Sequence, residues 1–524
     1  MKRKENLLRV EKTEKSGDSW DLVVIGGGAS GLGVALDALS RGLQVLLLEK
    51  ADFAKGTSSR STKLVHGGVR YLAQGEVGLV FEALKERGRL LKNAPHLTVN
   101  QPFIIPLYTI FDRLKYSIGL KIYDWMAGGL RLGKSRFISP EETYRRLPKI
   151  RRENLRGGIV YHDGQFDDAR LALMVARTCD DMGGCMLNYT KVNELSKDAS
   201  GRINGLVFRD VVGKNNYKVR AKTVVNATGV FADKILQMDR PDAQKMIQPS
   251  QGVHLVLDGS FLGGSDALMI PETSDGRVLF AVPWQGKLVV GTTDTLRKKP
   301  KMEPQPLSSE ITFILETAGQ YLKKAPRRED VLSVFAGLRP LAAPKEGSTK
   351  TKEISRSHKV IVSDSQLVTI TGGKWTTFRK MGEDTVDVHY RIHGIKAVES
   401  TSAGKHLHGY LEHPEEGPLH LYGADAATIR ALQQSNPEWA QPIHPDYPYT
   451  GAEVVWSVRE EMAIKVEDFL SRRCRILLLD AKAALHMAPR VAALMAAELG
   501  KDEEWIMSEL EEFYKLAKKY LIQT

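Results

Sequence analysis

The chain has 524 residues, which exceeds the length over which one hydrophobic core keeps growing, so two or three domains are expected. Its hydrophobic content of 42% and charged content of 26% are those of an ordinary globular protein, which excludes collagen-like and disordered classes. The formal charge of +12 suits an anionic substrate, an anionic membrane surface or nucleic acid, but dispersed basic residues and no zinc-finger or RNA-binding signature make nucleic acid the least favoured partner.

Cysteine usage and the N-terminal sequence indicate the compartment. The three cysteines, Cys179, Cys185 and Cys474, form no C-x-x-C pair, which favours a reducing environment and packing roles. The first residues are basic but lack the apolar core of a secretory signal, and no apolar run reaches about eighteen residues. We therefore expect a protein that neither crosses a membrane nor is secreted by that route.

Residues 21–50 predict a dinucleotide cradle, made of a buried strand, a glycine turn, an amphipathic helix and a second strand. Gly26 permits the tight turn, Gly28 lets the backbone reach a pyrophosphate, and Gly31 allows the helix to approach the strand. Glu49 ends the second strand, where an acid accepts hydrogen bonds from a ribose and argues against a 2′-phosphate. FAD and NAD both remain open from this unit alone.

The next segment, Thr57 to Leu72 (TSSRSTKLVHGGVRYL), concentrates hydroxyls, glycines and cations directly after the cradle. It predicts a loop that lines a polar or anionic ligand, with a solvated basic loop as the alternative. Apolar residues at helical spacing then predict a helix over 76–91. Farther on, 113–136 holds six basic residues among aromatic and aliphatic ones; it suits either an interfacial segment or a basic surface helix.

A second helix is predicted over 166–181, with Asp167 or Asp168 as its cap. Strand-like stretches follow, and Asn215 and Asn216 lie near the expected hairpin turn.

Two later segments bring small residues to the ends of strands. The strand in 223–230 ends in Thr228 and Gly229, which allow close approach of a planar or phosphorylated ligand or act as simple strand punctuation. Residues 251–293 then read as short antiparallel strands of a second domain.

In TGGKWTTFR, residues 371–379, Gly372 and Gly373 open a helix whose N–H groups favour negative charge, and Lys374 adds a cation there. From about residue 452 helical periodicity dominates, which predicts an all-helical C-terminal region.

An ordered set of motifs resembles the FAD-dependent, quinone-linked glycerol-3-phosphate dehydrogenases of the D-amino-acid-oxidase-like flavoprotein superfamily. These motifs are DLVVIGGGASG, SSRSTKLVHGGVRYL, YHDGQFDDARL, NATG, QGVHLVL, VPWQGKLVVGTTD, AGLRPL, GGKWTTFRK, WSVREEMA and DFLSRR. The match runs almost the full chain. A soluble, oxygen-using glycerol-3-phosphate oxidase is the nearest alternative, although the long insertion of those oxidases is not evident; a non-catalytic flavin-binding scaffold is a third reading.

The resemblance implies an α/β fold with a Rossmann-like FAD-binding domain of glutathione-reductase type, an antiparallel-sheet substrate domain and a C-terminal all-helical domain. The corresponding boundaries are 18–100, 160–245 and 330–392 for the FAD-binding domain, 101–159 and 246–329 for the substrate domain, and 400–524 for the helical domain.

The resemblance also implies the residues that bind FAD. They are Gly26, Gly28, Ala29, Ser30, Gly31, Glu49, Ser58, Ser59, Ser61, Lys63, Leu64, Thr228, Gly229, Gly372, Gly373, Lys374 and Thr376. No metal site is expected.

The implied substrate site collects cations and hydrogen-bond donors for a phosphate. They are Arg70, Tyr71, His254, Arg339, Arg356 and Lys374, of which His254, Arg339 and Lys374 are the expected catalytic residues. Each also has a structural alternative, such as an interdomain salt bridge for Arg70 or Arg339, and Arg356 fits the family pattern most loosely.

The implied reaction is oxidation of sn-glycerol 3-phosphate to dihydroxyacetone phosphate, with hydride passing to FAD and electrons then passing to a membrane quinone. His254 is the first choice of base, helped or replaced by Arg339. The protein is expected in the cytoplasm, peripherally bound to the inner face of the cell membrane, without a nucleic-acid partner; a homodimer remains open.

Overall fold

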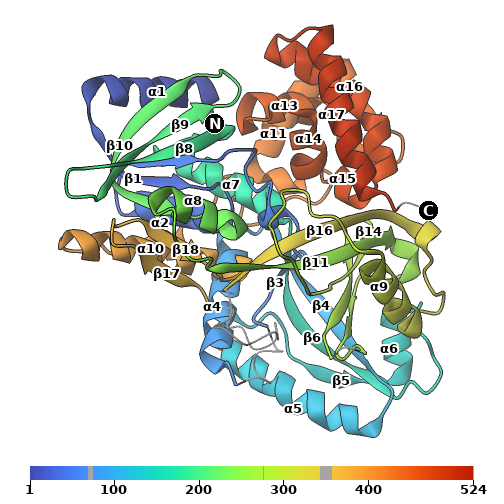
Figure 1. Cartoon of the computed structure of the whole chain (residues 1–524). Coiled ribbons are helices and arrows are strands. Elements are labelled where there is room, and N and C mark those ends of the chain that lie inside the picture. Colours follow the sequence, from blue (N-terminus) through green and yellow to red (C-terminus); the bar gives the residue numbers. More distant parts are fainter. Residues whose placement is uncertain (69–74, 275, 343–356, 523–524) are drawn as a thin grey trace.

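A computed structural model of the chain describes residues 1–68, 75–274, 276–342 and 357–522. In these residues, two sheets and a group of C-terminal helices form three adjoining parts (Figure 1). The first sheet and its helices carry the glycine turn, the second sheet lies beside it, and the helices that follow residue 400 lie against both.

The centre of the first sheet is parallel. The strand β1 (Ser19–Ile25) pairs with β2 (Val45–Leu48) and with β10 (Asn216–Asn226). The remaining strands are β7 (Cys185–Leu187), β8 (Thr190–Lys197), β9 (Ile203–Asp210), β17 (Lys359–Val362) and β18 (Val368–Thr371). Because β1 and β2 are apolar on both faces, they require cover on both sides.

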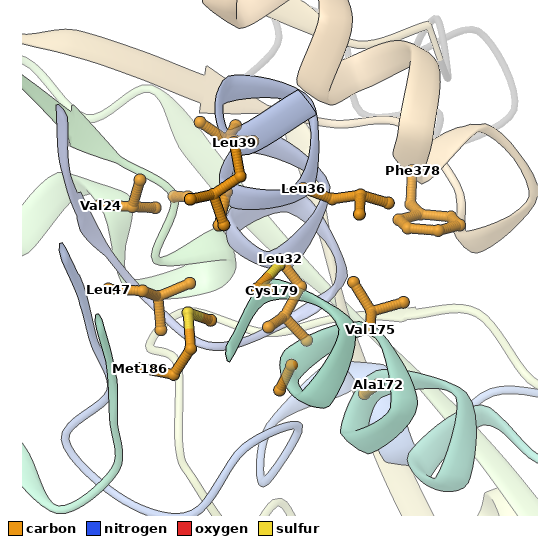
Figure 2. Packing of buried hydrophobic residues seen from close by; sticks show 14 of the residues in the cluster. Val24, Leu32, Leu36, Leu39, Leu47, Ala172, Val175, Cys179, Met186 and Phe378 are labelled. Carbon is orange, nitrogen blue, oxygen red and sulfur yellow. The ribbon is translucent and has the colours of Figure 1, made fainter. Parts of the chain in front are cut away.

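Helices supply that cover. One face packs against α2 (Ala29–Ser40) and α7 (Asp168–Asp181), and Figure 2 shows their side chains interleaved with the sheet. The labelled residues are Val24, Leu32, Leu36, Leu39, Leu47, Ala172, Val175, Cys179, Met186 and Phe378. On the other face lie α1 (Arg3–Ser16) and α8 (Ala232–Asp239).

Two expected helices and the expected hairpin are confirmed. The helix α7 begins after Asp167, whose side chain accepts hydrogen bonds from the N–H groups of Ala169 and Arg170, and α4 spans Val77–Asn93. The turn at Asn215 joins β9 to β10 in an antiparallel pair. All three cysteines are buried and free, as packing residues would be.

The helix α10 (Phe378–His393) packs closely on α2. A Cβ atom added at Gly382 would lie 2.1 Å from the carbonyl oxygen of Gly33, so the two backbones are in direct contact. Just before α10, a short 3-10 turn, Trp375–Thr377, follows the two glycines. The close packing therefore fixes where this turn lies relative to the glycine turn before α2.

The second sheet is mostly antiparallel, as the sequence predicts for 251–293. In the described part of the chain its strands are β3 (Leu64–Val65), β4 (Thr98–Leu107), β5 (Arg136–Ile138), β6 (Gly157–Phe166), β11 (Ile247–Asp258), β12 (Ala267–Ile270), β13 (Leu279–Trp284), β14 (Lys287–Gly291), β15 (Thr295–Leu296) and β16 (Val331–Ala342). One side packs on α6 (Pro140–Arg146) and α9 (Ser308–Tyr321), and the other on α5 (Ile110–Ala127).

The strand β16 lies in this second sheet, although the boundaries drawn from the sequence assign its residues to the FAD-binding domain. It pairs with β11 from Ile247 opposite Ala342 to Leu257 opposite Val331. In the described residues β16 pairs with β11 and with no strand of the first sheet. The chain therefore returns to the first sheet only at β17 and β18.

The C-terminal region is helical apart from a short hairpin of β19 (Pro442–His444) and β20 (Tyr447–Thr450). Its helices are α11 (Ala426–Ser435), α12 (Pro437–Ala440), α13 (Gly451–Glu461), α14 (Val466–Asp468), α15 (Ile476–Leu479), α16 (Ala481–Leu499) and α17 (Glu503–Ala517). They share a core with β11, β13, β14 and β16. None of the helices in the described ranges is long and apolar enough to cross a bilayer.

Candidate cofactor and substrate site

A cavity of about 450 Å³ is lined by residues of both sheets. It brings together most of the residues expected from the sequence. They are Gly26, Gly28, Ala29, Ser30, Glu49, Ser58, Ser61, Leu64, Thr228, Gly229, His254, Arg339, Gly372, Gly373, Lys374 and Thr376. The cavity therefore joins the glycine turn at the start of α2 to the cationic side chains of β16 and of the turn before α10.

The glycine turn has the geometry of a phosphate cradle. A Cβ atom at Gly26, where φ is +115°, would lie 2.6 Å from the carbonyl oxygen of Ala227. Gly28 precedes the first residue of α2, and the Ser58 hydroxyl accepts a hydrogen bond of 2.9 Å from the N–H of Ala29. The cavity thus meets the N-terminus of a long helix, where N–H groups and the helix dipole favour phosphate.

Glu49 is held at the end of β2 by backbone donors. Its carboxylate accepts hydrogen bonds from the N–H of Gly27 at 2.7 Å and of Ala51 at 2.9 Å. Burial raises the pKa of Glu49, while these two donors lower it. The oxygens therefore lie beside the glycine turn, in the place that a ribose contact requires.

Three residues expected at the cofactor, Gly31, Ser59 and Lys63, are not among those that line the cavity. Gly31 faces the turn itself, because a Cβ atom there would lie 1.9 Å from the carbonyl oxygen of Gly26. The Ser59 side chain is buried. Lys63 has a positive φ of 64°, and its ammonium group turns away from the cavity to Asp168.

The turn before α10 requires both of its glycines. Gly372 and Gly373 have φ values of +75° and +76°, and a Cβ atom at Gly373 would lie 2.4 Å from the sulfur of Met381. The indole N–H of Trp375 donates to the carbonyl oxygen of Ser58 at 2.8 Å, which ties this turn to the loop after β2. Lys374, at the same turn, lines the cavity.

His254 lies on β11 and is 2% exposed. Its Nε2 atom is 2.9 Å from the Thr62 hydroxyl, and its ring stacks on Phe335 with centroids 4.9 Å apart. Burial, together with the positive charges of Lys63 and Arg339, holds the pKa of His254 well below its usual value. The imidazole is therefore neutral at pH 7, which is the state that a proton acceptor requires.

Arg339 lies on β16 with a side chain that is 25% exposed. Its guanidinium group donates to the carbonyl oxygen of Thr293 at 3.1 Å and to the Thr292 hydroxyl at 3.2 Å, and it is 3.3 Å from a carboxylate oxygen of Asp294. These contacts hold a planar cation at the cavity wall, where it suits an anionic substrate.

The remaining substrate residues expected from the sequence, Arg70, Tyr71 and Arg356, lie outside the described residues. Conversely, sequence reasoning did not single out Thr62 or Asp294. Thr62 lies inside the polar segment noted after the cradle, so its position was visible, but its contact with His254 depends on a strand far along the chain. Asp294 follows β14 and gave no separate signal.

The chain matches two family models. The model described as FAD dependent oxidoreductase covers residues 21–377, and the C-terminal domain of alpha-glycerophosphate oxidase covers residues 369–506.

Its relatives match over nearly the whole chain. It is 38% identical to the probable mitochondrial glycerol-3-phosphate dehydrogenase of Caenorhabditis elegans, over 97% of this chain and 74% of that protein. It is 40% identical to the probable mitochondrial enzyme of Dictyostelium discoideum, over 96% of this chain and 84% of that protein.

Two solved structures share the fold of this chain. The glycerol-3-phosphate dehydrogenase from Bacillus halodurans complexed with FAD superposes with a TM-score of 0.80 at 31% identity, covering 100% of this chain and 99% of that one. The L-alpha-glycerophosphate oxidase from Mycoplasma pneumoniae, with a TM-score of 0.57 and 17% identity over 74% of this chain and 98% of that one, shares the fold.

Proposed function

The chain belongs to the FAD-dependent glycerol-3-phosphate dehydrogenases, and on this basis we propose that it oxidises sn-glycerol 3-phosphate to dihydroxyacetone phosphate and passes the electrons to a quinone. The cofactor of this family is FAD. One observation carries the proposal: a single cavity joins the phosphate cradle of Gly26 and Gly28 to His254, Arg339 and Lys374.

The residues present fit FAD. The cradle has no room for a Cβ atom at Gly26, and its helix N-terminus and Glu49 offer partners for a pyrophosphate and a ribose. Thr228 and Gly229 from the end of β10, with Gly372 and Gly373, would hold the other parts of the cofactor. When bound, FAD supplies an acceptor for the hydride of the substrate carbinol.

The cationic side chains would bind and orient the substrate. The guanidinium group of Arg339 would hold the phosphate or the developing negative charge on the carbinol oxygen, since its planar donors suit either oxygen set. Lys374, at the turn before α10, would add positive charge to the cavity and so favour the negative charge that a bound flavin gains when it is reduced. The family resemblance also assigns Arg70, Tyr71 and Arg356, which lie outside the described residues, to phosphate binding.

The hydroxyl proton would reach His254 through Thr62, whose hydroxyl is 2.9 Å from Nε2 and lines the cavity: Thr62 would take the substrate proton and pass its own to Nε2 of His254. Its Nδ1 atom is buried, without a hydrogen-bond partner in the described part of the chain, so it is shielded from substrate. The dianionic phosphate would bring negative charge toward the imidazole, and this raises the pKa of His254 when the substrate binds. The imidazole would therefore be a stronger base with substrate present than without it.

The central experiment is anaerobic addition of glycerol 3-phosphate to the purified yellow protein. The visible flavin absorbance should bleach, and Arg339→Ala should retain bound flavin but lose turnover by about a hundredfold or more, because a charged, bidentate contact is lost. Arg136→Ala, which removes an exposed arginine paired with Glu142, is the matched control. A flavin that glycerol 3-phosphate does not reduce would refute the proposed substrate.

The electron acceptor needs a separate measurement, since the match to the C-terminal domain of alpha-glycerophosphate oxidase keeps an oxygen-using enzyme as the second candidate. During turnover the enzyme should reduce a soluble quinone analogue, and it should form little hydrogen peroxide in air. Stoichiometric peroxide and no quinone reduction would assign the oxidase activity instead.

A quinone acceptor requires contact with a membrane surface, which we place on α4 and α5. These helices pack together through Val80, Leu84 and Tyr123, and they lie at the end of the molecule away from the C-terminal helices (Figure 1). On α5, Trp125 is 81% exposed and Ile122 is 44% exposed. An exposed tryptophan on a helix suits the interface of a bilayer.

The membrane proposal is tested by flotation with vesicles that contain anionic lipid. The double variant Ile122→Ser and Trp125→Ser should bind about tenfold or more weakly, because two exposed apolar side chains are lost. Met507→Ser, at an exposed methionine of α17, is the control and should bind as the unchanged protein does. Equal flotation of the double variant would remove this surface from the proposal and would leave the substrate assignment untouched.

A further inference from the structure

A fully buried charge cluster lies beside the cavity without lining it. It consists of Lys63, Asp168 and Arg475, each 0% exposed. The ammonium group of Lys63 donates to both carboxylate oxygens of Asp168, at 2.9 and 2.7 Å, and Arg475 Nη2 donates to Asp168 Oδ1 at 2.7 Å. Two cations thus share one carboxylate of α7.

The cluster also holds the loop that runs along the cavity. The carbonyl oxygen of Ser59 accepts hydrogen bonds of 2.8 Å from both Lys63 and Arg475. Ser61 donates to Asp168 Oδ2 from its N–H at 3.0 Å and from its hydroxyl at 2.7 Å. Residues 59–63 are therefore wound around the Asp168 carboxylate.

Both cations come from strained backbone. Lys63 has a φ of 64° and Arg475 a φ of 67°, the left-handed region that residues with a Cβ atom rarely adopt. Such conformations persist where the surroundings over-determine them, often near functional sites. Here the surroundings are the bonds to Asp168 and Ser59.

The same loop contacts the proposed base. Thr62, between the two residues that bind Asp168, places its hydroxyl 2.9 Å from His254 Nε2. The Lys63 ammonium group lies 5.2 Å from the centroid of Phe335, the ring on which His254 stacks. The cluster therefore adjoins His254 both through the loop and through the aromatic ring.

The C-terminal region also contacts residues 52–55, which precede this loop in the chain. Arg472 and Arg473 both donate to the buried carboxylate of Asp52, with Arg472 Nε at 2.6 Å from Oδ2, and Glu467 pairs with Lys55. The segment 467–475 thus contacts residues 52–63 near both the beginning and the end of that stretch. Burial disfavours the charged form of Asp168, but Lys63 and Arg475 hold its pKa below the usual value, so the carboxylate stays ionised. Burial lowers the pKa of Lys63 to about 7, and the adjacent Asp168 opposes this shift.

We infer that Lys63 and Arg475 are positioning residues for the oxidation assigned under the proposed function: by clamping Asp168, they fix residues 59–63 so that the Thr62 hydroxyl orients His254 toward the substrate. The C-terminal helical region thereby helps to build the active site, although none of residues 467–475 lines the cavity. Burial is the main reason that the pKa of His254 is low, and the positive charge of Lys63 adds to this effect.

The first test replaces Arg475 in the FAD-bound protein. Arg475→Gln should lower kcat about tenfold or more with KM for glycerol 3-phosphate changed by less than about threefold, because the base is misaligned while the substrate contacts remain. Arg475→Lys, which keeps a cation, should retain most of the kcat of the unchanged protein. Arg459→Gln, at an exposed pair with Glu498 in the same region, is the matched control.

Hydrogen exchange gives a readout that does not depend on activity. Backbone amides of residues 52–63 should exchange faster in Arg475→Gln than in the control variant, while those of β1 and β2 remain unchanged. Slower turnover with unchanged exchange in this loop would overturn the positioning role.

The second test uses Lys63→Met and the pH profile of kcat/KM. Because the charge of Lys63 lowers the pKa of His254, its removal raises that pKa, and the acidic limb of the profile should move to higher pH; Arg459→Gln should leave the limb in place. If the acidic limb does not move, the charge of Lys63 has no effect on the pKa of His254, which contradicts this part of the inference.

Two further outcomes separate a failure of this inference from a failure of the proposed function. Variants at both Lys63 and Arg475 that bind no flavin and do not fold would assign the cluster to stability alone and overturn the inference. If glycerol 3-phosphate fails to reduce the flavin of the unchanged protein, the proposed function fails first, whereas the exchange result on 52–63 still reports whether the clamp holds the loop.

Discussion

His254 shows how one buried side chain is prepared for proton transfer. It is neutral because burial and two neighbouring cations lower its pKa. It is oriented because Thr62 contacts its Nε2 atom and Phe335 stacks on the face of the ring. These properties come from three separate segments of the chain, namely β11, β16 and the loop with Thr62 and Lys63, so neither the residue nor its immediate neighbours in sequence specify them.

His254→Asn should lower kcat by about 10² to 10⁴, the range typical for loss of a general base, while flavin remains bound. His389→Asn is the control, because His389 is also buried and also hydrogen-bonded to a threonine, Thr223, but does not line the cavity. Turnover of His254→Asn within about threefold of the control, measured by flavin reduction in single turnovers, would exclude His254 as the base.

The residues that line the cavity were predictable where the motif itself sets their direction. Gly26, Gly28 and Glu49 follow from a local strand, turn and helix, and all three line the cavity. Lys63 shows the limit: a lysine in a polar loop suggests a ligand contact, but its positive φ directs the side chain to Asp168, and neither φ nor this distant partner is visible in the local sequence.

At the scale of elements, the contact between α2 and α10 fixes two sides of the cavity. The backbones meet at Gly33 and Gly382, and each helix begins next to a glycine turn that lines the cavity. The two glycine turns were sufficient to predict that a helix follows each of them. The pairing of β16 with β11 was not predictable, because the strand pattern alone does not say which sheet a strand joins.

Gly382→Ala should destabilise the protein by about 1–3 kcal/mol and weaken flavin binding, because a Cβ atom forces the two helices apart. Urea unfolding and flavin titration of the apoprotein measure both effects. Gly119→Ala in α5, where a Cβ atom meets open space, should instead be neutral or stabilising by up to about 1 kcal/mol. Equal stability of the two variants would contradict the close contact.

At the scale of the whole molecule, charged contacts join the C-terminal region to the helices of the first sheet. His408 hydrogen-bonds to Asp181 at 2.6 Å and to Asp425 at 3.1 Å, and Arg177 of α7 also pairs with Asp425. The helical character of this region was predictable from sequence. Its role was not, because its buried arginines acquire meaning only from partners such as Asp52 and Asp168.

Stability should depend on pH through His408. Burial opposes the charged form, but Asp181 and Asp425 raise the pKa of His408 above its usual value. A raised pKa contributes stability that is fully present below pH about 6.5 and is lost as pH rises through the folded-state value. The free energy of unfolding should therefore fall more between pH 6 and 8 in the unchanged protein than in His408→Gln.

The control for this measurement is His413→Gln, at an exposed histidine of the same region. It should keep the pH dependence of the unchanged protein. If His408→Gln keeps it too, the contact with Asp181 and Asp425 contributes no titrating stability.

The clamp on Asp168 also has a consequence for biosynthesis. Arg475 reaches the carbonyl oxygen of Ser59 across 416 residues of chain, so the wall of the flavin cavity is secured only after the segment that contains Arg475 has left the ribosome. A nascent chain can fold its glycine turn early, but it should retain the vitamin-derived cofactor firmly only once the segment with Arg475 has been synthesised.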